Sequence, residues 1–226
     1  NPVASAQPVQ ANTQASEKGI TIVAQGQVTA KPDIAWITIG VRTTAVTARQ
    51  AMDENNAAVA AVIAKLESMG IAKKDMQTGN ISLYPQTKAP RPEEAGPEQI
   101  VAYWANNSLR VTVRNLGTLG AVLDAAVSAG ANSVSGIRFG VDDDSKLRDE
   151  ALKEAIKTAR AKADLVAEGL GLRVTGVQSV SLESYATPGP VYYEVAAPAA
   201  RMAAGEVPVE TGELTFTASV RVTFVF

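Results

Sequence analysis

The sequence predicts an α+β fold with a mainly antiparallel sheet, in which two long helices and one short helix pack on one face. Three observations predict it. Several segments alternate apolar and polar residues with a period of two, which is typical of strands. Two long segments repeat apolar residues every three or four positions, as helices do. The expected order ββαββαβαββ lacks the strict alternation of a parallel α/β sheet.

The first two strands are expected on either side of a turn at Lys31-Pro32-Asp33. Residues 20–28 place Ile20, Ile22, Ala24 and Val28 on one face of the first strand. In the second strand, Ala35, Ile37, Ile39 and Val41 alternate with Trp36, Thr38, Gly40 and Arg42. The two segments therefore indicate an antiparallel pair.

The first long helix is expected from Thr47 to Met69. Thr47 is a suitable N-cap, and Gly70 is a suitable residue just after the C-terminus. One apolar stripe contains Met52, Val59, Val62, Leu66 and Met69. Asn55 falls on the same stripe, so we expect its amide to be hydrogen-bonded or to lie near the helix start or a wet interface.

The remaining elements follow from the same periodicities. Strands are expected over residues 77–84, 100–114, 134–141, 174–182 and 213–226, and a short helix is expected over 116–130. The second long helix is expected over 145–169, where many alanines on the inner face indicate close approach to a sheet. Residues 1–18 lack periodicity and are expected to be disordered. Residues 19–226 are expected to form a single domain with long proline-containing loops at 85–99 and 185–212.

The composition excludes several classes of chemistry. The chain of 226 residues contains no His and no Cys. Disulfides, thiolate nucleophiles, Cys/His zinc sites and histidine bases are therefore impossible. The net charge of −2 leaves no basic excess for phosphates, so no nucleic-acid partner is expected. We expect no catalytic residues, no metal site and no cofactor.

The targeting signals are weak. No window reaches the length of apolar sequence that a membrane-spanning helix needs, so we expect a chain that does not span the membrane. The first residues, rich in Ala, Gln, Ser and Pro, lack the basic and apolar regions of a signal peptide. Such a beginning is typical of an exported chain after cleavage, and equally of an ordinary frayed terminus.

A colinear set of short motifs extends from about Gly19 to Phe226. It consists of Gly26 with Pro32-Asp33, Thr47-Ala48-Arg49 with Ala51 and Asn55, Asp75-Met76-Gln77-Thr78-Gly79, Tyr84-Pro85, Tyr103, Leu109 to Arg114, Gly120 with Leu123-Asp124, Gly130-Ala131-Asn132, and the helix with Ala159, Lys162, Ala163 and Leu165. In this set the chain resembles the SIMPL-domain family of bacterial cell-envelope proteins. This chain has Ala102 where family members usually have Gly before the tyrosine.

The resemblance implies an exported, periplasmic α+β protein without known catalysis. The alternatives for its location are the free periplasm and association with the outer membrane. It also implies assembly into ring- or channel-like homo-oligomers and a part in envelope integrity and stress tolerance. The expected partners are copies of the chain itself, with other envelope proteins as a second class of partner. The family has no established catalytic motif, so no catalytic residue is carried over to this chain.

Other motifs have simpler structural interpretations. Asp142-Asp143-Asp144 lacks the alternating carboxylates and glycine bend of a calcium loop, and its carboxylates suit a helix N-terminus. Gly169-Leu170-Gly171 closes a helix instead of opening one, which favours a C-cap over a phosphate-binding loop. Glu183 and Asp124 are candidate carboxylates for a hydrolase, but the sequence gives neither of them a partner.

Aromatic residues are the candidate contact residues for self-assembly or for a partner. They are Trp36, Trp104, Tyr192, Tyr193 and Met202, the last three in the second long loop. Burial under a helix is the alternative for the two tryptophans. The leading hypothesis is a self-assembling structural or stress-protection protein of the envelope. The alternative is a monomeric module that binds a peptide or small ligand, for instance by strand addition to the last strand if it lies at a sheet edge.

Overall fold

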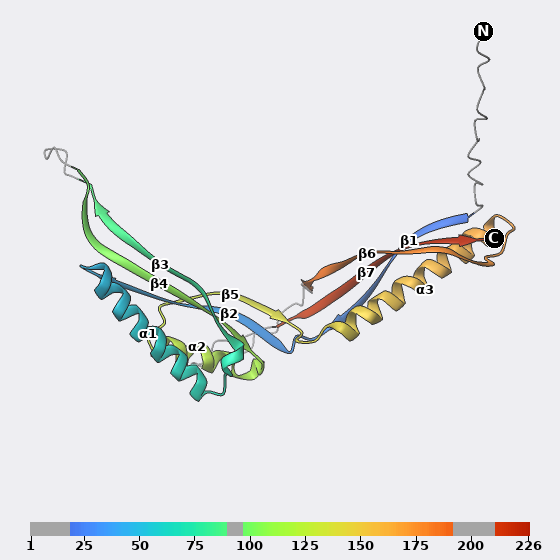
Figure 1. The fold of residues 1–226 in the computed structure, drawn as a ribbon. Helices are drawn as coiled ribbons and strands as arrows, with labels where there is room; N and C mark the ends of the chain where they lie inside the picture. Colours follow the sequence, from blue (N-terminus) through green and yellow to red (C-terminus); the bar gives the residue numbers. More distant parts are fainter. Residues whose placement is uncertain (1–18, 90–96, 192–210) are drawn as a thin grey trace, which may run out of the picture. The chain divides into compact units, whose positions relative to one another are not determined.

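A computed structural model describes residues 19–89, 97–191 and 211–226 (Figure 1). The elements are β1 (Gly19–Ala30), β2 (Ile34–Ala45), α1 (Ala48–Ser68), η1 (Lys73–Asp75), β3 (Met76–Lys88), β4 (Gln99–Val113), η2 (Leu116–Thr118), α2 (Leu119–Ser128), β5 (Ser133–Gly140), α3 (Ser145–Gly169), β6 (Gly176–Val191) and β7 (Glu213–Val225). The α+β class and the predicted order of strands and helices are confirmed.

The chain divides into two compact units. Of the described residues, unit 1 contains 19–28, 145–187 and 216–226, and unit 2 contains 29–89, 97–144, 188–191 and 211–215. Each unit has its own antiparallel sheet. Whether residues 19–226 behave as one domain, as expected from the sequence, is not decided by this division, so the single domain stays a prediction. The expected disorder of residues 1–18 lies outside the described residues.

The sheet of unit 2 has the strand order β3-β4-β2-β5. In its centre, β2 and β4 pair antiparallel from Ala35 opposite Val113 to Ala45 opposite Tyr103. A shift in register between β2 and β5 follows Trp36, and Gly136 nearby has a φ of 65° that favours glycine. This register decides which side chains share a face of the sheet.

Both helices of unit 2 pack on one face of this sheet. The core combines residues of β2 and β4 with Val62 and Leu66 from α1 and Leu119 and Val122 from α2. Asn55, fully buried on α1, donates from Nδ2 to Val41 O at 2.9 Å and to Ala105 O at 3.2 Å. The predicted apolar stripe is therefore correct, and the polar residue on it bonds the two central strands.

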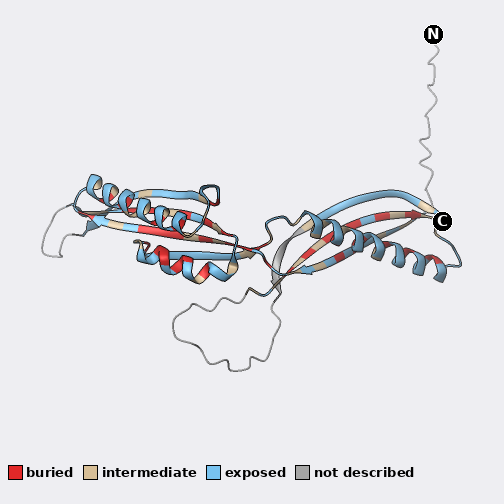
Figure 2. Ribbon diagram, turned by 90° about the horizontal axis from the view of Figure 1, so that it is seen from below, coloured by how far each residue is buried: buried red, intermediate tan, exposed pale blue. Residues whose placement is uncertain are grey.

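Unit 1 has the strand order β1-β7-β6, with α3 packed against it. The helix contacts the sheet through alanines at every fourth position, namely Ala151, Ala155, Ala159, Ala163 and Ala167. A Cβ atom on Gly26 of β1 would lie 2.2 Å from both Ala151 O and Ala155 N. The predicted close approach is therefore confirmed, and Figure 2 shows the buried residues along these strands.

The strands run further than predicted into the two expected loops. β3 continues through Pro85 to Lys88, β4 begins at Gln99, and β6 continues to Val191. The loop prediction is therefore wrong for residues 85–88, 99 and 185–191. β3 and β6 are edge strands, where a proline can sit without interrupting a ladder on both sides. Residues 90–96 and 192–210 lie outside the described part of the chain.

Candidate functional site

The predicted contact residues divide into two groups. Tyr192, Tyr193 and Met202 lie outside the described residues, so their role stays a prediction. Trp36 on β2 and Trp104 on β4 both lie on the face of the unit 2 sheet that is opposite α1 and α2, because their strand neighbours on the other face form the core. Neither tryptophan is therefore buried under a helix of that unit.

Trp36 is half-buried by its own sheet. A Cβ atom on Gly140 of the neighbouring strand β5 would lie 2.3 Å from two carbon atoms of the indole. The ring therefore occupies the space that the missing side chain of Gly140 leaves open. Trp36, a predicted contact residue, therefore uses part of its aromatic surface to pack between β2 and β5.

Trp104 is more accessible, with 39% of its surface exposed. The guanidinium of Arg42 lies 5.6 Å from its ring centroid, and exposed Tyr84 is its neighbour on β3. Trp36 lies opposite Thr112, whereas Trp104 lies opposite Thr44, eight positions further along β2. The two tryptophans are therefore about 26 Å apart along the strands and do not form one cluster.

The sheet face that carries the tryptophans is called here the open face. Its positions on β2 and β4 are Trp36, Thr38, Gly40, Arg42, Thr44, Trp104, Asn106, Ser108, Arg110 and Thr112, and Arg138 of β5 lies opposite Trp36. None of these positions is an aspartate or glutamate, and the three arginines are exposed. This surface was not identified from the sequence. The signal was present, because every second residue of β2 and of β4 belongs to this face and none of these residues is acidic.

A second polar cluster lies around Arg114, directly after β4. Its Nη2 lies 2.9 Å from Asp75 Oδ1 and its Nε lies 3.0 Å from Asp75 Oδ2, so the pair is bidentate. Its Nη1 donates to Asp142 Oδ2 at 2.6 Å. The backbone N–H of Asp142 donates in turn to Asp33 Oδ1 at 2.9 Å. Four separate segments of unit 2 thus meet at this cluster.

The electrostatics of this cluster favour a structural role. Hydrogen bonds from Arg114 hold the pKa of Asp75 below its usual range, although burial acts in the opposite direction. The hydrogen bonds to Asp75 and Asp142 raise the pKa of Arg114. A general acid at neutral pH needs a carboxyl with a raised pKa, so the shift of Asp75 has the wrong direction for that task.

The two candidate carboxylates for a hydrolase belong to different units. Glu183 accepts from Arg221 Nε at 2.7 Å, and this hydrogen bond lowers the pKa of Glu183. Asp124 is exposed on α2. Within the described ranges, no group of three or more acidic side chains is placed to hold a metal ion.

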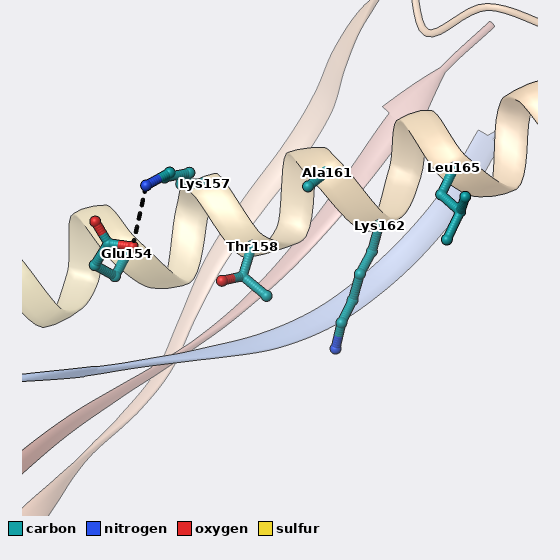
Figure 3. A pocket seen from close by; sticks show the side chains of 6 residues that line it. All are labelled: Glu154, Lys157, Thr158, Ala161, Lys162 and Leu165. Carbon is teal, nitrogen blue, oxygen red and sulfur yellow. Dashed lines mark ion pairs between the residues drawn. The ribbon is translucent and has the colours of Figure 1, made fainter.

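A shallow, open groove of about 310 Å³ lies along α3 (Figure 3). Its lining comes from that helix alone and consists of Glu154, Lys157, Thr158, Ala161, Lys162 and Leu165. Glu154 Oε2 and Lys157 Nζ are 3.5 Å apart, so the charges at one end of the groove are paired. Exposed side chains of a single helix surround no enclosed volume for a reaction.

The hypothesis that β7 accepts a partner strand is wrong. β7 lies between β1 and β6, so neighbours occupy both of its sides. The buried residues of β7, including Val220, Val222 and Phe224, belong to the core of unit 1. The edges of this sheet are β1 and β6 instead.

Two smaller interpretations are refined. Gly171 has a φ of 73°, and Leu172 N donates to Ala167 O at 2.8 Å, which confirms a helix C-cap. The carboxylate of Asp142, expected to interact with the N-terminus of α3, pairs with Arg114 instead.

In the part of the chain that the structure describes, no helix combines the length and hydropathy that crossing a membrane requires.

Comparisons with known proteins agree with the motif pattern. The SIMPL family, described as "Protein of unknown function (DUF541)", matches residues 20–224. The "26 kDa periplasmic immunogenic protein" of Brucella melitensis biotype 1 is 33% identical over 225 residues, which cover 98% of this chain and 89% of that protein. The "Uncharacterized protein YggE" of Escherichia coli K12 is 31% identical over 221 residues, covering 97% of this chain and 88% of that protein. The chain therefore belongs to the SIMPL family.

Proposed function

We propose that the chain is a periplasmic protein without catalytic activity that assembles with copies of itself into a structural or stress-protection component of the envelope. The periplasmic location is supported by the name of the Brucella relative. The absence of His and Cys from the sequence and the non-enzymatic names of the relatives support a role without catalysis.

The observation that carries the self-assembly proposal is the edge strand β6. It lies at one edge of the unit 1 sheet, and its apolar side chains Val177, Val180 and Leu182 are all exposed. Val180 is the most exposed of the three, at 59%. An edge strand with exposed apolar residues offers both unpaired backbone groups and apolar area to another strand. A second copy of the chain can supply such a strand from its own β6.

Light scattering coupled to size-exclusion chromatography tests the proposal. We expect an assembly larger than a monomer at micromolar concentration. Val180→Lys should shift it to smaller species, since a lysine on an edge strand opposes strand pairing. The matched control is Val127→Lys on α2, where the valine is 55% exposed and belongs to the other unit. The control should keep the size of the assembly.

A strictly monomeric chain would contradict self-assembly. The alternative would then be a monomeric module of the envelope that binds a peptide or small ligand. Such a module could not bind a partner strand through β7, because both sides of β7 are occupied. An equal loss of size in both lysine variants would show that β6 is not the contact. Contact roles for Trp36, Trp104, Tyr192, Tyr193 and Met202 are part of the proposal and are tested by substituting each residue in the same measurement.

A further inference from the structure

We propose that the open face of unit 2 binds an acidic glycan, that is, a sugar polymer with carboxylate groups. This binding does not use the β6 contact proposed for self-assembly, because the open face belongs to unit 2, whereas the exposed apolar residues of β6 belong to unit 1. The contact roles proposed above for Trp36 and Trp104 use the same face, and the size measurement and the sugar titration distinguish the two uses. The inference rests on three features of the face: its charge, its aromatic side chains and the polar groups between them.

The charge of the face is uniform. Arg42, Arg110 and Arg138 are exposed, and the ion pairs seen among the described residues involve other cations, such as Arg114, Arg160 and Arg221. Arg110 lies opposite Thr38 and Arg138 lies opposite Trp36, while Arg42 is four positions beyond Thr38 on β2. The three arginines therefore extend over about 20 Å along the strands. The chain as a whole carries a net charge of −2, so this cationic face does not reflect a general basic excess.

Aromatic groups stand beside the arginines. Tyr84 and Trp104 are cross-strand neighbours at one end of the face, where Arg42 lies over the indole. Sugar rings present an apolar face of C–H groups, which stacks on aromatic rings, while their carboxylates accept bidentate hydrogen bonds from arginine. A repeating acidic sugar thus matches the alternation of aromatic and guanidinium groups along the sheet.

The positions between these groups favour a glycan over a protein or a lipid surface. Thr38, Asn106, Ser108 and Thr112 supply hydroxyl and amide groups that can bond sugar hydroxyls. No Leu, Ile, Val, Met or Phe occupies the open-face positions of β2 from 36 to 44 or of β4 from 104 to 112. Protein interfaces usually centre on an apolar core, and membrane surfaces are entered by protruding apolar side chains.

The test uses the full chain and tetragalacturonate as the probe, with maltotetraose, an uncharged α-1,4-linked tetrasaccharide, as the reference. The chain has two tryptophans, both on the open face, so titration is followed by intrinsic fluorescence and by calorimetry. We expect tetragalacturonate to bind and maltotetraose to bind far more weakly. The triple variant R42Q/R110Q/R138Q should lose at least about tenfold in affinity, since each bidentate arginine–carboxylate contact is charge-assisted.

The matched control is R49Q/K153Q/R173Q, which removes the same charge from exposed positions elsewhere. It should bind the probe like the original chain, and unchanged circular dichroism of both triple variants secures their fold. Trp104→Leu keeps all arginines and should weaken binding as well. The proposal is overturned by no binding of tetragalacturonate at millimolar concentration, by equal losses in both triple variants, or by binding of anionic vesicles or an oligothymidylate in its place.

Discussion

Asn55 shows how a single residue of the motif set serves the fold. Its side chain connects α1 with backbone carbonyls of both central strands of unit 2. Next to it, Thr43 Oγ1 donates to Ala51 O at 2.7 Å, so a second polar contact joins β2 to the same helix. The sequence could show that Asn55 lies on the apolar stripe, but the acceptors are 14 and 50 positions away and only the fold brings them near.

Replacement of Asn55 by Leu should destabilise unit 2. Two buried carbonyls would lose their donor, which costs about 2–3 kcal/mol of unfolding free energy. Urea unfolding followed by circular dichroism measures the change. Asn56→Leu, at the exposed neighbouring position on α1, should change the free energy by less than about 0.5 kcal/mol. Similar losses in the two variants would show that the hydrogen bonds of Asn55 contribute little.

Asp75 should make the stability of the protein sensitive to acid. Its side chain is 8% exposed and ion-paired, and the hydrogen bonds from Arg114 lower its pKa in the folded state. The stabilisation is therefore present above the unfolded pKa of about 3.9 and is lost as the pH falls through the lower folded pKa. Asp75→Asn should flatten this part of the stability curve.

The measurement is the urea midpoint from neutral pH down to about pH 2, where paired carboxylates become protonated. The control is Asp53→Asn, which removes an exposed carboxylate from α1 and should keep the acid sensitivity of the original chain. An Asp75→Asn variant with the same acid profile as the original chain would mean that other carboxylates determine the acid response.

At the scale of elements, the period of the apolar residues predicts a helix or strand correctly where only one face of the element is buried. The helix predicted over 145–169 agrees with α3 because its buried alanines repeat every four residues. Prolines misled the prediction at 85–88 and 185–191, since an edge strand tolerates a residue that usually ends a central strand. The location of an edge depends on which strands pair, and pairing between distant segments leaves no local signal.

The contact between β1 and α3 should be intolerant of any side chain at Gly26. Gly26→Ala would drive its Cβ into the backbone of α3 and should cost about 1–3 kcal/mol through overpacking. Thermal unfolding measures the loss. Gly169→Ala is the matched control, because nothing lies within 4 Å of its Cβ position, and a helical alanine should leave stability equal or slightly raised. Equal stability of both variants would refute the close approach.

At the scale of the whole molecule, the two units differ in how the chain builds them. Unit 1 combines three distant segments, whereas most of unit 2 is one continuous stretch, residues 29–144. β1, β6 and β7 each contain residues of both units. The sequence predicted the order of the elements but not their division into two sheets, because that division depends on contacts between β1, β6 and β7 that are far apart in the chain.

A fragment of residues 29–144 should therefore fold without the rest of the chain. It contains the whole four-stranded sheet, both of its helices, every residue of their core and the cluster around Arg114. We expect cooperative thermal unfolding by circular dichroism, and Val62→Ala should lower the stability of the fragment and of the full chain by a similar amount, about 2 kcal/mol. A fragment that unfolds without cooperativity would mean that unit 2 needs unit 1, and that residues 19–226 fold as one inseparable domain.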